Sequence, residues 1–587
     1  MILAIKGVAS LIFFLFLSGY TALAFKKIST INRKYLFSII ISLWLSWPLI
    51  ILINIFELNF QPFHLLVLFL FCLLTIFLVD KNEFHFSQIK SYFFYLFFCI
   101  LLIVVIFAYK YIPVFVHGDA VFQWNGRWAW SLYQNNFQSY GNYPVFWPGL
   151  WALIYKSLGT FDNWIFSNLT LFIILIISFL TVLEFKQINL KFFVINFLIL
   201  IYICAALYNR FFIGYMDGPL TLLYYSCINL IILFVLSKNF EYLFFGAFLI
   251  SLTAITKQQG FILPAIFFVS GILFVKNKLL SINKYFLLSI IVSVHFVILT
   301  YFYDSNPISF ILDALTGTGN SNQSYLHYLS KAHIKEENTY IYSLIELSKR
   351  FNIFLILIIF TFSFLNFFLF KKNVLFQLGT VLFIFSIISF FYFAKYGSYD
   401  ERNGWFIMPI IFGSSLCFIN YFNFTFLKNL SEKLKFLNLI NINSKKNIKS
   451  NSILIYVIVL VFVLGLSFEK LVGFNYTQKL VQEQLGDKEL AVKAKKLIEF
   501  SNDCTKVYSN FHIIVYNYHL IKFYNLDKNN SKIIEFGGWD FTDKINKKEC
   551  KTGQIWILNN SNYPEEFKNL LKTINHKIHH PNLIEVK

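Results

Sequence analysis

The sequence predicts an α-helical integral membrane protein with about fourteen transmembrane helices and a small C-terminal α/β domain. Three observations predict this class. Hydrophobic residues make up 57% of the 587 residues, and the mean hydropathy is +0.63. Apolar stretches long enough to cross a bilayer as helices recur along most of the chain. After residue 468 the pattern changes to the mixed polar and apolar sequence of a water-exposed domain.

The apolar stretches are predicted to be helices because backbone polar groups inside lipid need partners within their own segment. The first stretch begins directly after Met1, without a basic leader or a small-residue cleavage site, and is predicted to be a retained helix rather than a signal peptide. The spanning stretches are 2–24, 36–56, 63–79, 93–112, 164–183, 192–207, 219–236, 243–255, 261–275, 285–301, 351–370, 374–394, 405–426 and 452–468.

Basic residues are distributed by loop. The formal net charge of +20 could suit a nucleic-acid-binding protein. However, Lys and Arg gather in alternate loops, which is typical of the cytoplasmic loops of membrane proteins. Nucleic acid is therefore not an expected partner. Both termini, the first long hydrophilic loop and the tail are predicted to face away from the cytoplasm. The basic loops lie at 26–34, 81–90, 186–191, 238, 276–284, 371–372 and 428–449.

The tail, residues 469–587, is predicted to alternate strands and helices. A helix is expected over 478–500, and another near Pro564, because proline and acidic residues suit a first helical turn. Short β-prone runs occur at 506–509, 532–536, 554–558 and 583–586. Metal binding by His576, His579 and His580 is the less favoured reading, since exposed histidines near a terminus are usually solvated.

Cysteine placement agrees with an outward-facing tail. Cys504 and Cys550 are the two cysteines of the tail. In an oxidising compartment two such residues suggest one disulfide, and two unpaired thiols are the alternative. The remaining cysteines lie within apolar stretches, where they are expected to pack as small apolar side chains.

Asp119 opens the first long hydrophilic loop, after an apolar stretch that ends at residue 112. Ionisable groups at the edge of a membrane bundle are functional candidates, and a carboxylate there could act as a base at the bilayer surface. A solvated loop aspartate is the alternative. Polar and aromatic residues surround it: His117, Trp124, Arg127, Trp128, Trp130, Tyr133 and Tyr143. These aromatic residues could contact a substrate or form an interfacial belt.

The stretch 150–158 in the same loop is apolar but too short to span the bilayer. We expect a helix lying in the membrane interface, with Trp147 and Trp151 at headgroup depth. The loop would then be a partly immersed lid.

Later outward turns carry Arg210, Asp217, Lys257 and Arg402. Each has a simpler explanation: Asp217 could cap a helix, Lys257 could snorkel to the interface, and Arg402 could pair with charged neighbours. Together with Asp119, however, they would lie on one membrane face. Carboxylates that activate a nucleophile and cations that hold a phosphate are complementary parts of a group-transfer site.

Five short stretches follow one another along the chain: Asp119-Ala120 with Trp124 and Trp128, Tyr143-Pro144 with Pro148, 214–220, 256–260, and Glu401-Arg402 before Pro409. Their order resembles that of the polytopic glycosyltransferases of the GT-C type. This superfamily takes sugars from polyprenyl-phosphate donors, and it includes the protein O-mannosyltransferases and the lipid A aminoarabinose transferases.

The resemblance implies a multi-pass enzyme of a bacterial inner membrane. It would transfer a sugar, with inversion, from a polyprenyl-phosphate donor to a lipid, glycan or protein acceptor at the periplasmic face. It implies a transmembrane domain over 1–468, in which 1–91 are extra helices and 92–427 the GT-C-like core, followed by a periplasmic domain over 469–587.

The same resemblance implies a role for each candidate residue. Asp119 would be the general base. The donor phosphate would be bound by Arg402, Lys257 and Arg210. The substrates would be oriented by Asp217, His117, Trp124 and Tyr143.

The sequence departs from the family pattern at three places. The first loop has one acid rather than a pair, Gln259 stands where an acid is common, and Asn403 stands where tyrosine is usual. No metal-ligand spacing is found, and the departures leave open whether a divalent metal takes part. An O-antigen-type polymerase or ligase is one alternative function. A lipid or sugar transporter is another, although it would favour repeated halves and acids near the bilayer midplane, which the sequence lacks.

Overall fold

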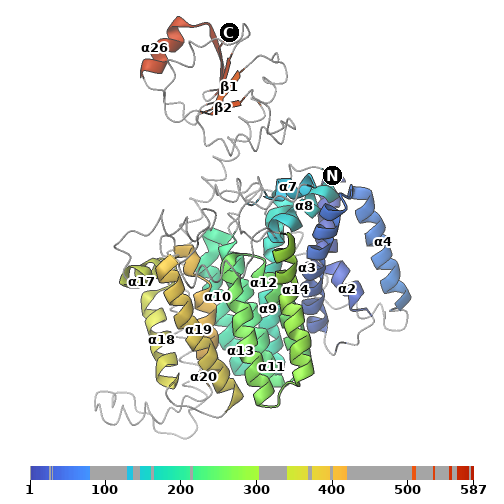
Figure 1. Cartoon of the computed structure of the whole chain (residues 1–587), viewed down its shortest axis with the longest axis vertical. Coiled ribbons are helices and arrows are strands. Elements are labelled where there is room, and N and C mark those ends of the chain that lie inside the picture. Colours follow the sequence, from blue (N-terminus) through green and yellow to red (C-terminus); the bar gives the residue numbers. More distant parts are fainter. Residues whose placement is uncertain are drawn as a thin grey trace.

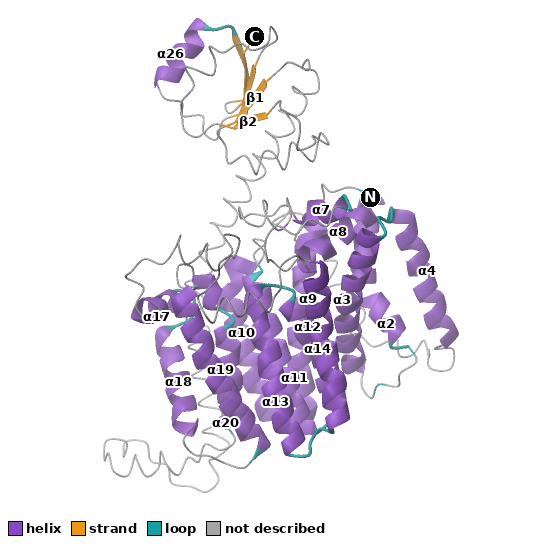
Figure 2. Ribbon diagram, viewed as in Figure 1, coloured by secondary structure: helices purple, strands orange, loops and turns teal. Residues whose placement is uncertain are grey.

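A computed structural model describes residues 2–24, 28, 31–79, 124, 128–135, 146–159, 164–211, 216–302, 340–367, 373–396, 401–419, 493, 506–509, 533–535, 554–557, 565–580 and 583–586. Long helices lie side by side in a bundle, and the described strands all belong to the C-terminal part (Figure 1, Figure 2). The predicted helices over 93–112, 452–468 and 478–500 lie outside the described residues, as do Cys504 and Cys550.

The helices of the bundle largely follow the predicted apolar stretches. The segments are α1 (Ile2–Ile12), a π-helical turn (Phe13–Leu17), α2 (Ser18–Ala22), α3 (Ile31–Ile55), α4 (Pro62–Val79), α7 (Trp130–Tyr133), α8 (Phe146–Leu158), α9 (Trp164–Ile188), α10 (Leu190–Phe211), α11 (Asp217–Ser237), α12 (Phe240–Ala254), η4 (Gln258–Phe261), α13 (Ile262–Lys276), α14 (Ile282–Phe302), α17 (Tyr340–Ser348), α18 (Ile353–Phe367), α19 (Val374–Tyr396), η5 (Glu401–Gly404) and α20 (Ile407–Phe418).

Six helical segments among the described residues are long and apolar enough to cross a membrane: 5–22, 32–55, 190–207, 217–237, 259–276 and 374–394. The outer faces of the bundle carry large apolar side chains. Phe63 and Phe71 on α4 and Phe286 on α14 are each more than 60% exposed. Continuous apolar surface of this kind is unfavourable in water and suits contact with lipid. The chain is therefore a multi-pass membrane protein.

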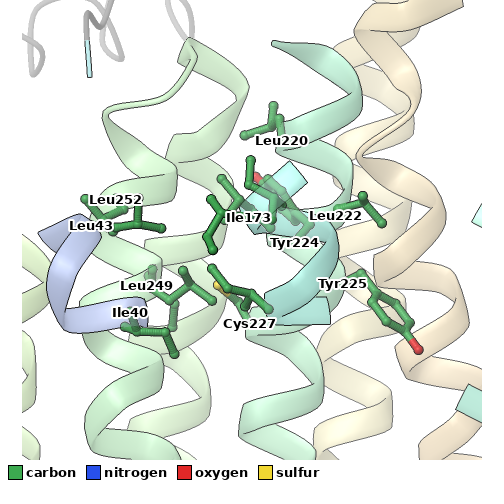
Figure 3. Packing of buried hydrophobic residues seen from close by; sticks show 14 of the residues in the cluster. Ile40, Leu43, Ile173, Leu220, Leu222, Tyr224, Tyr225, Cys227, Leu249 and Leu252 are labelled. Carbon is green, nitrogen blue, oxygen red and sulfur yellow. The ribbon is translucent and has the colours of Figure 1, made fainter. Parts of the chain in front are cut away.

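The centre of the bundle is formed by α11 and its neighbours. Among the described membrane-length helices, α11 is the most buried, and it packs against α9, α12 and α20. Figure 3 shows Cys227 of α11 in one apolar cluster with Leu249 and Leu252 of α12 and Ile40 and Leu43 of α3. The N-terminal helix α3 is thus part of the same core, because it contacts both α9 and α12.

A buried network of charged residues joins three helix ends on one side of the bundle. Arg33 of α3 donates from Nε to Glu184 Oε2 of α9 over 3.2 Å, and its Nη2 donates to the Tyr242 hydroxyl of α12 over 2.7 Å. The Tyr242 hydroxyl in turn donates to Glu184 Oε2 over 2.7 Å. Glu241 adds a second carboxylate, 3.5 Å from Arg33 Nη1. The ends of α3, α9 and α12 that adjoin three loops predicted to be cytoplasmic therefore meet on one side of the bundle.

The C-terminal part contains a five-stranded sheet of order β2-β1-β3-β5-β4. Its strands are β1 (Lys506–Ser509), β2 (Ile533–Glu535), β3 (Gln554–Ile557), β4 (His576–His580) and β5 (Leu583–Val586), and α26 spans Glu565–Thr573. The strand β1 is parallel to β2 and β3, whereas β5 is antiparallel to β3 and β4.

Four of these strands and the helix near Pro564 coincide with predicted elements. The fifth strand, β4, was missed. Its histidines were expected to be a solvated terminal segment, but His576 and His580 pair with β5, and His579 Nε2 lies 2.8 Å from Glu585 Oε2. This cross-strand pair gives His579 a structural role.

Candidate active site on one side of the bundle

The predicted site residues divide into two groups. Asp119, His117 and Tyr143 lie outside the described residues. The backbone of Arg210 lies in the last turn of α10. Trp124 is buried and meets Trp128 edge-to-face, with 5.1 Å between ring centroids. The remaining three predicted residues, Asp217, Lys257 and Arg402, come from segments far apart in the chain.

Asp217 and Lys257 form a buried ion pair between Lys257 Nζ and Asp217 Oδ1. Their side chains are only 4% and 7% exposed. The carboxylate does not simply cap α11, because it stands in the first turn and its side chain binds Lys257. The ammonium does not snorkel either. Both simple explanations weighed from the sequence are wrong for this pair, because a buried charge needs a partner and these two residues supply each other's.

Two amide side chains extend the ion pair. Asn403 Oδ1, in η5, lies 3.4 Å from Lys257 Nζ and accepts from Gln259 Nε2 over 3.3 Å. In the sequence, Gln259 and Asn403 stand out only as departures from a family pattern. Their positions inside two of the five stretches were the available signal that they belong to the site. Arg402 immediately precedes Asn403 and is partly exposed.

Two hydrogen bonds hold the turn that carries Lys257 and Gln259 in place. The Tyr224 hydroxyl of α11 donates to the carbonyl of Gln259 over 2.5 Å, and the Gly260 N–H donates to the Lys257 carbonyl over 2.8 Å. A Cβ atom on Gly260 would lie 2.0 Å from the carbonyl oxygen of Thr253. Only glycine lets this turn approach the end of α12 so closely.

Gly260→Ala is accordingly expected to destabilise the protein by about 3 kcal/mol, or more if the backbone cannot relax. Gly246→Ala is the matched control in α12. Its Cβ would meet Leu230 at an ordinary 3.5 Å, and alanine favours a helix by roughly 0.5–1 kcal/mol over glycine. Thermal unfolding of the purified protein measures both. Equal midpoints for the two variants would contradict the close approach at residue 260.

Helix α8 also contacts this turn. Trp147 Nε1 donates to Thr256 Oγ1 over 3.2 Å, and the Phe146 N–H donates to the Ile255 carbonyl over 3.3 Å. Trp151 Nε1 donates to Thr170 Oγ1 over 3.0 Å. The expectation that this helix forms a lid in the membrane interface is therefore wrong. All residues of α8 are buried, and both indoles pack within the protein rather than facing lipid headgroups.

Sidedness can be followed along α12, because Tyr242 and Thr253 lie near its two ends. Tyr242 belongs to the Arg33 network, and the carbonyl of Thr253 touches the turn that carries Lys257. These ends are separated by roughly 17 Å at 1.5 Å per residue. Turns predicted to face outward thus gather at the end of α12 opposite the predicted cytoplasmic loops.

The described site is polar and charge-balanced. The ion pair contributes no net charge, and Asp217 and Asn403 occupy two of the three N–H groups of Lys257. The remaining ammonium N–H of Lys257 is a cationic donor that an anion could engage. Within the described ranges, no group of three or more His, Cys, Asp or Glu side chains could hold a metal ion.

Comparisons with known proteins place few limits on the chain. No family model matches it, and no curated protein matches it. Two solved structures are similar: ArnT from Cupriavidus metallidurans bound to undecaprenyl phosphate, and the same protein in the apo state. Both have 10% sequence identity to this chain. The first covers 85% of this chain and 98% of its own, with a TM-score of 0.48. For the second the coverages are 84% and 98%, and the TM-score is 0.43. At this identity the likeness does not identify a substrate or an activity for the chain.

Proposed function

We propose that this chain is a membrane glycosyltransferase that moves a sugar from a polyprenyl-phosphate donor to a lipid, glycan or protein acceptor at the outer face of a bacterial inner membrane. The supporting observation is that Asp217, Lys257 and Asn403 converge from three segments spread over almost 190 positions of the chain. These segments are three of the five motif stretches. Stretches that merely follow one another along the sequence therefore contact one another in the fold.

The proposed reaction is a direct displacement at the anomeric carbon. Asp119 takes the proton of the acceptor hydroxyl, and the oxygen then attacks the anomeric carbon from the face opposite the phosphate. A new glycosidic bond forms, the bond between anomeric carbon and phosphate oxygen breaks, and the configuration inverts. The leaving polyprenyl phosphate keeps the bonding electron pair.

The cationic side chains stabilise the leaving phosphate. Arg402 is suited to a bidentate contact, and the remaining N–H of Lys257 supplies a point charge. Arg210 is proposed as a third phosphate ligand. Asp217 positions Lys257 by holding its ammonium, and His117, Trp124 and Tyr143 are proposed to orient the substrates. The C-terminal domain is proposed to position the acceptor rather than to perform chemistry.

A transfer assay tests this function. The purified protein is placed in vesicles made from its own membrane lipids, together with undecaprenyl phosphate linked to radiolabelled glucose, mannose, galactose or aminoarabinose. We expect release of undecaprenyl phosphate from at least one donor and the label on an acceptor with inverted configuration. If no donor is cleaved and undecaprenyl phosphate does not bind, the proposed function is wrong.

Membrane sidedness gives an independent prediction. Single cysteines at residues 119, 212 and 560 in a cysteine-free chain should react with an impermeant maleimide added from the periplasm, because the charge pattern places them outside. A cysteine at residue 445 should react only after the membrane is opened. Labelling at residue 445 from outside, with protection at the other three positions, would reverse the topology and exclude a periplasmic site.

A further inference from the structure

The ammonium of Lys257 fixes the orientation of two amides. Lys257 has only donors, so the atom of Asn403 that faces it must be the oxygen. That same oxygen lies 3.3 Å from the side chain of Gln259, which must therefore present its NH₂ group to it. Amide orientations usually have to be inferred from such networks. Here the network starts at the Lys257 ammonium, which can only donate hydrogen bonds. Only one orientation of each of the two amides is therefore possible.

The forced orientation leaves the carbonyl oxygen of Gln259 on the far side of the amide. Gln259 is 91% buried as a residue, being 9% exposed. Its Oε1 is one of twelve buried side-chain polar atoms without a hydrogen-bond partner among the described residues. The Trp405 indole N–H, two residues beyond Asn403, is another. A buried polar group without a partner is costly, and each case in a native protein calls for an explanation.

The nature of the missing partner follows from chemistry. Phosphate oxygens accept hydrogen bonds and cannot satisfy a carbonyl oxygen, so the phosphate proposed for Lys257 is not the partner of Gln259 Oε1. A hydroxyl group can donate to it. In a polyprenyl-phosphate sugar the hydroxyls are attached to the ring next to the phosphate. A phosphate at Lys257 would therefore bring them close to Gln259.

We infer that Gln259 is a specificity-determining residue that accepts a hydrogen bond from a hydroxyl of the donor sugar and favours an uncharged sugar. This inference rests on the proposed function. The only described carboxylate in the network, Asp217, is already neutralised by Lys257. An ammonium group on the sugar beside Gln259 would therefore face Lys257 with no described carboxylate left to pair with it, which is unfavourable. A carboxylate at position 259 would supply that countercharge.

Equilibrium binding to the purified full-length protein tests the hydroxyl contact. The ligands are undecaprenyl phosphate alone and undecaprenyl phosphate linked to glucose, mannose or galactose. Wild type should bind at least one sugar-linked lipid more tightly than the bare lipid. Gln259→Leu should weaken that binding about tenfold, the size of one hydrogen bond lost with its partner left unpaired, and leave bare undecaprenyl phosphate within about twofold.

The matched control is Gln377→Leu in α19. Gln377 accepts from Asn277 over 3.1 Å on the predicted cytoplasmic side of the bundle. The Gln377→Leu variant should leave the affinities for undecaprenyl phosphate and for the sugar-linked lipid unchanged. An equal loss of both ligands in Gln259→Leu would indicate a structural role and overturn the inference. Unchanged binding of the sugar-linked lipid would overturn it too.

Gln259→Glu provides the second arm, which tests selectivity. The variant should raise the affinity for undecaprenyl phosphate linked to an amino sugar, relative to the neutral hexose, by about tenfold or more. An unchanged ratio in a folded variant would overturn the inference. If wild type binds undecaprenyl phosphate but Gln259 has no effect on the sugar, only this inference fails. If wild type binds none of these lipids, the proposed function fails as well.

Discussion

Asp119→Asn is expected to lower the rate of sugar transfer by roughly 10²–10⁴-fold, because the substitution keeps the size of the side chain and removes its ability to take a proton. Membrane insertion and thermal stability should be unchanged. The measurement is the rate of undecaprenyl phosphate release by the purified variant with the preferred donor. An effect on the turnover number, with little change in the affinity for the donor, would identify a base rather than a binding group.

Glu57→Gln is the matched control for this substitution. Glu57 follows α3 on the side of the membrane predicted to face outward, and its side chain is exposed. The same carboxylate-to-amide change there should leave transfer unaffected. Transfer near the wild-type rate in Asp119→Asn would remove Asp119 from the mechanism.

Lys257→Met is expected to destabilise the protein by about 3–5 kcal/mol, because it leaves the carboxylate of Asp217 buried without its partner. The double variant Asp217→Asn/Lys257→Met should recover most of that loss, since it removes both charges at once. Thermal unfolding of wild type, both single variants and the double variant gives the coupling free energy. Additive effects of the two substitutions would contradict a buried ion pair.

Lys568→Met is the control for this cycle. Lys568 Nζ lies 3.1 Å from Glu565 Oε2 in α26, and the two side chains are 46% and 73% exposed. Exposed ion pairs contribute only about 0–1 kcal/mol, so this variant should unfold at a temperature close to that of wild type.

In addition, the Asp217→Asn/Lys257→Met double variant should fold and still bind undecaprenyl phosphate poorly. That result would separate the role of Lys257 in binding from its role in stability.

The helices could be predicted from the sequence because their cause is local. A bilayer requires about twenty consecutive apolar residues per helix, and that requirement is visible in the chain itself. The strands β1, β2, β3 and β5 were similarly predicted from short β-prone runs. The side of the bundle on which Asp217 and Lys257 lie could also be predicted, since alternating basic loops fix the order of the helix ends.

The contacts within the site could not be predicted, because they depend on packing between distant segments. Nothing local to Asp217 indicates that Lys257 is its partner, or that Asn403 accepts a hydrogen bond from Gln259. The burial of α8 was missed for a related reason. Tryptophans with polar neighbours suit both a membrane interface and an interior that offers threonine hydroxyls, and only the packed structure distinguishes the two.

Photo-crosslinking with a polyprenyl-phosphate probe tests the central claim most directly, namely that the residues around Asp217, Lys257 and Asn403 bind the lipid phosphate. The probe carries a diazirine next to the phosphate, and mass spectrometry locates its attachment in the purified protein. We predict attachment within 256–260 or 401–405, suppressed by excess undecaprenyl phosphate and lost in the Asp217→Asn/Lys257→Met variant. Attachment around Arg33 and Glu184 at the opposite end of α12, or labelling that excess lipid does not suppress, would contradict the proposed site.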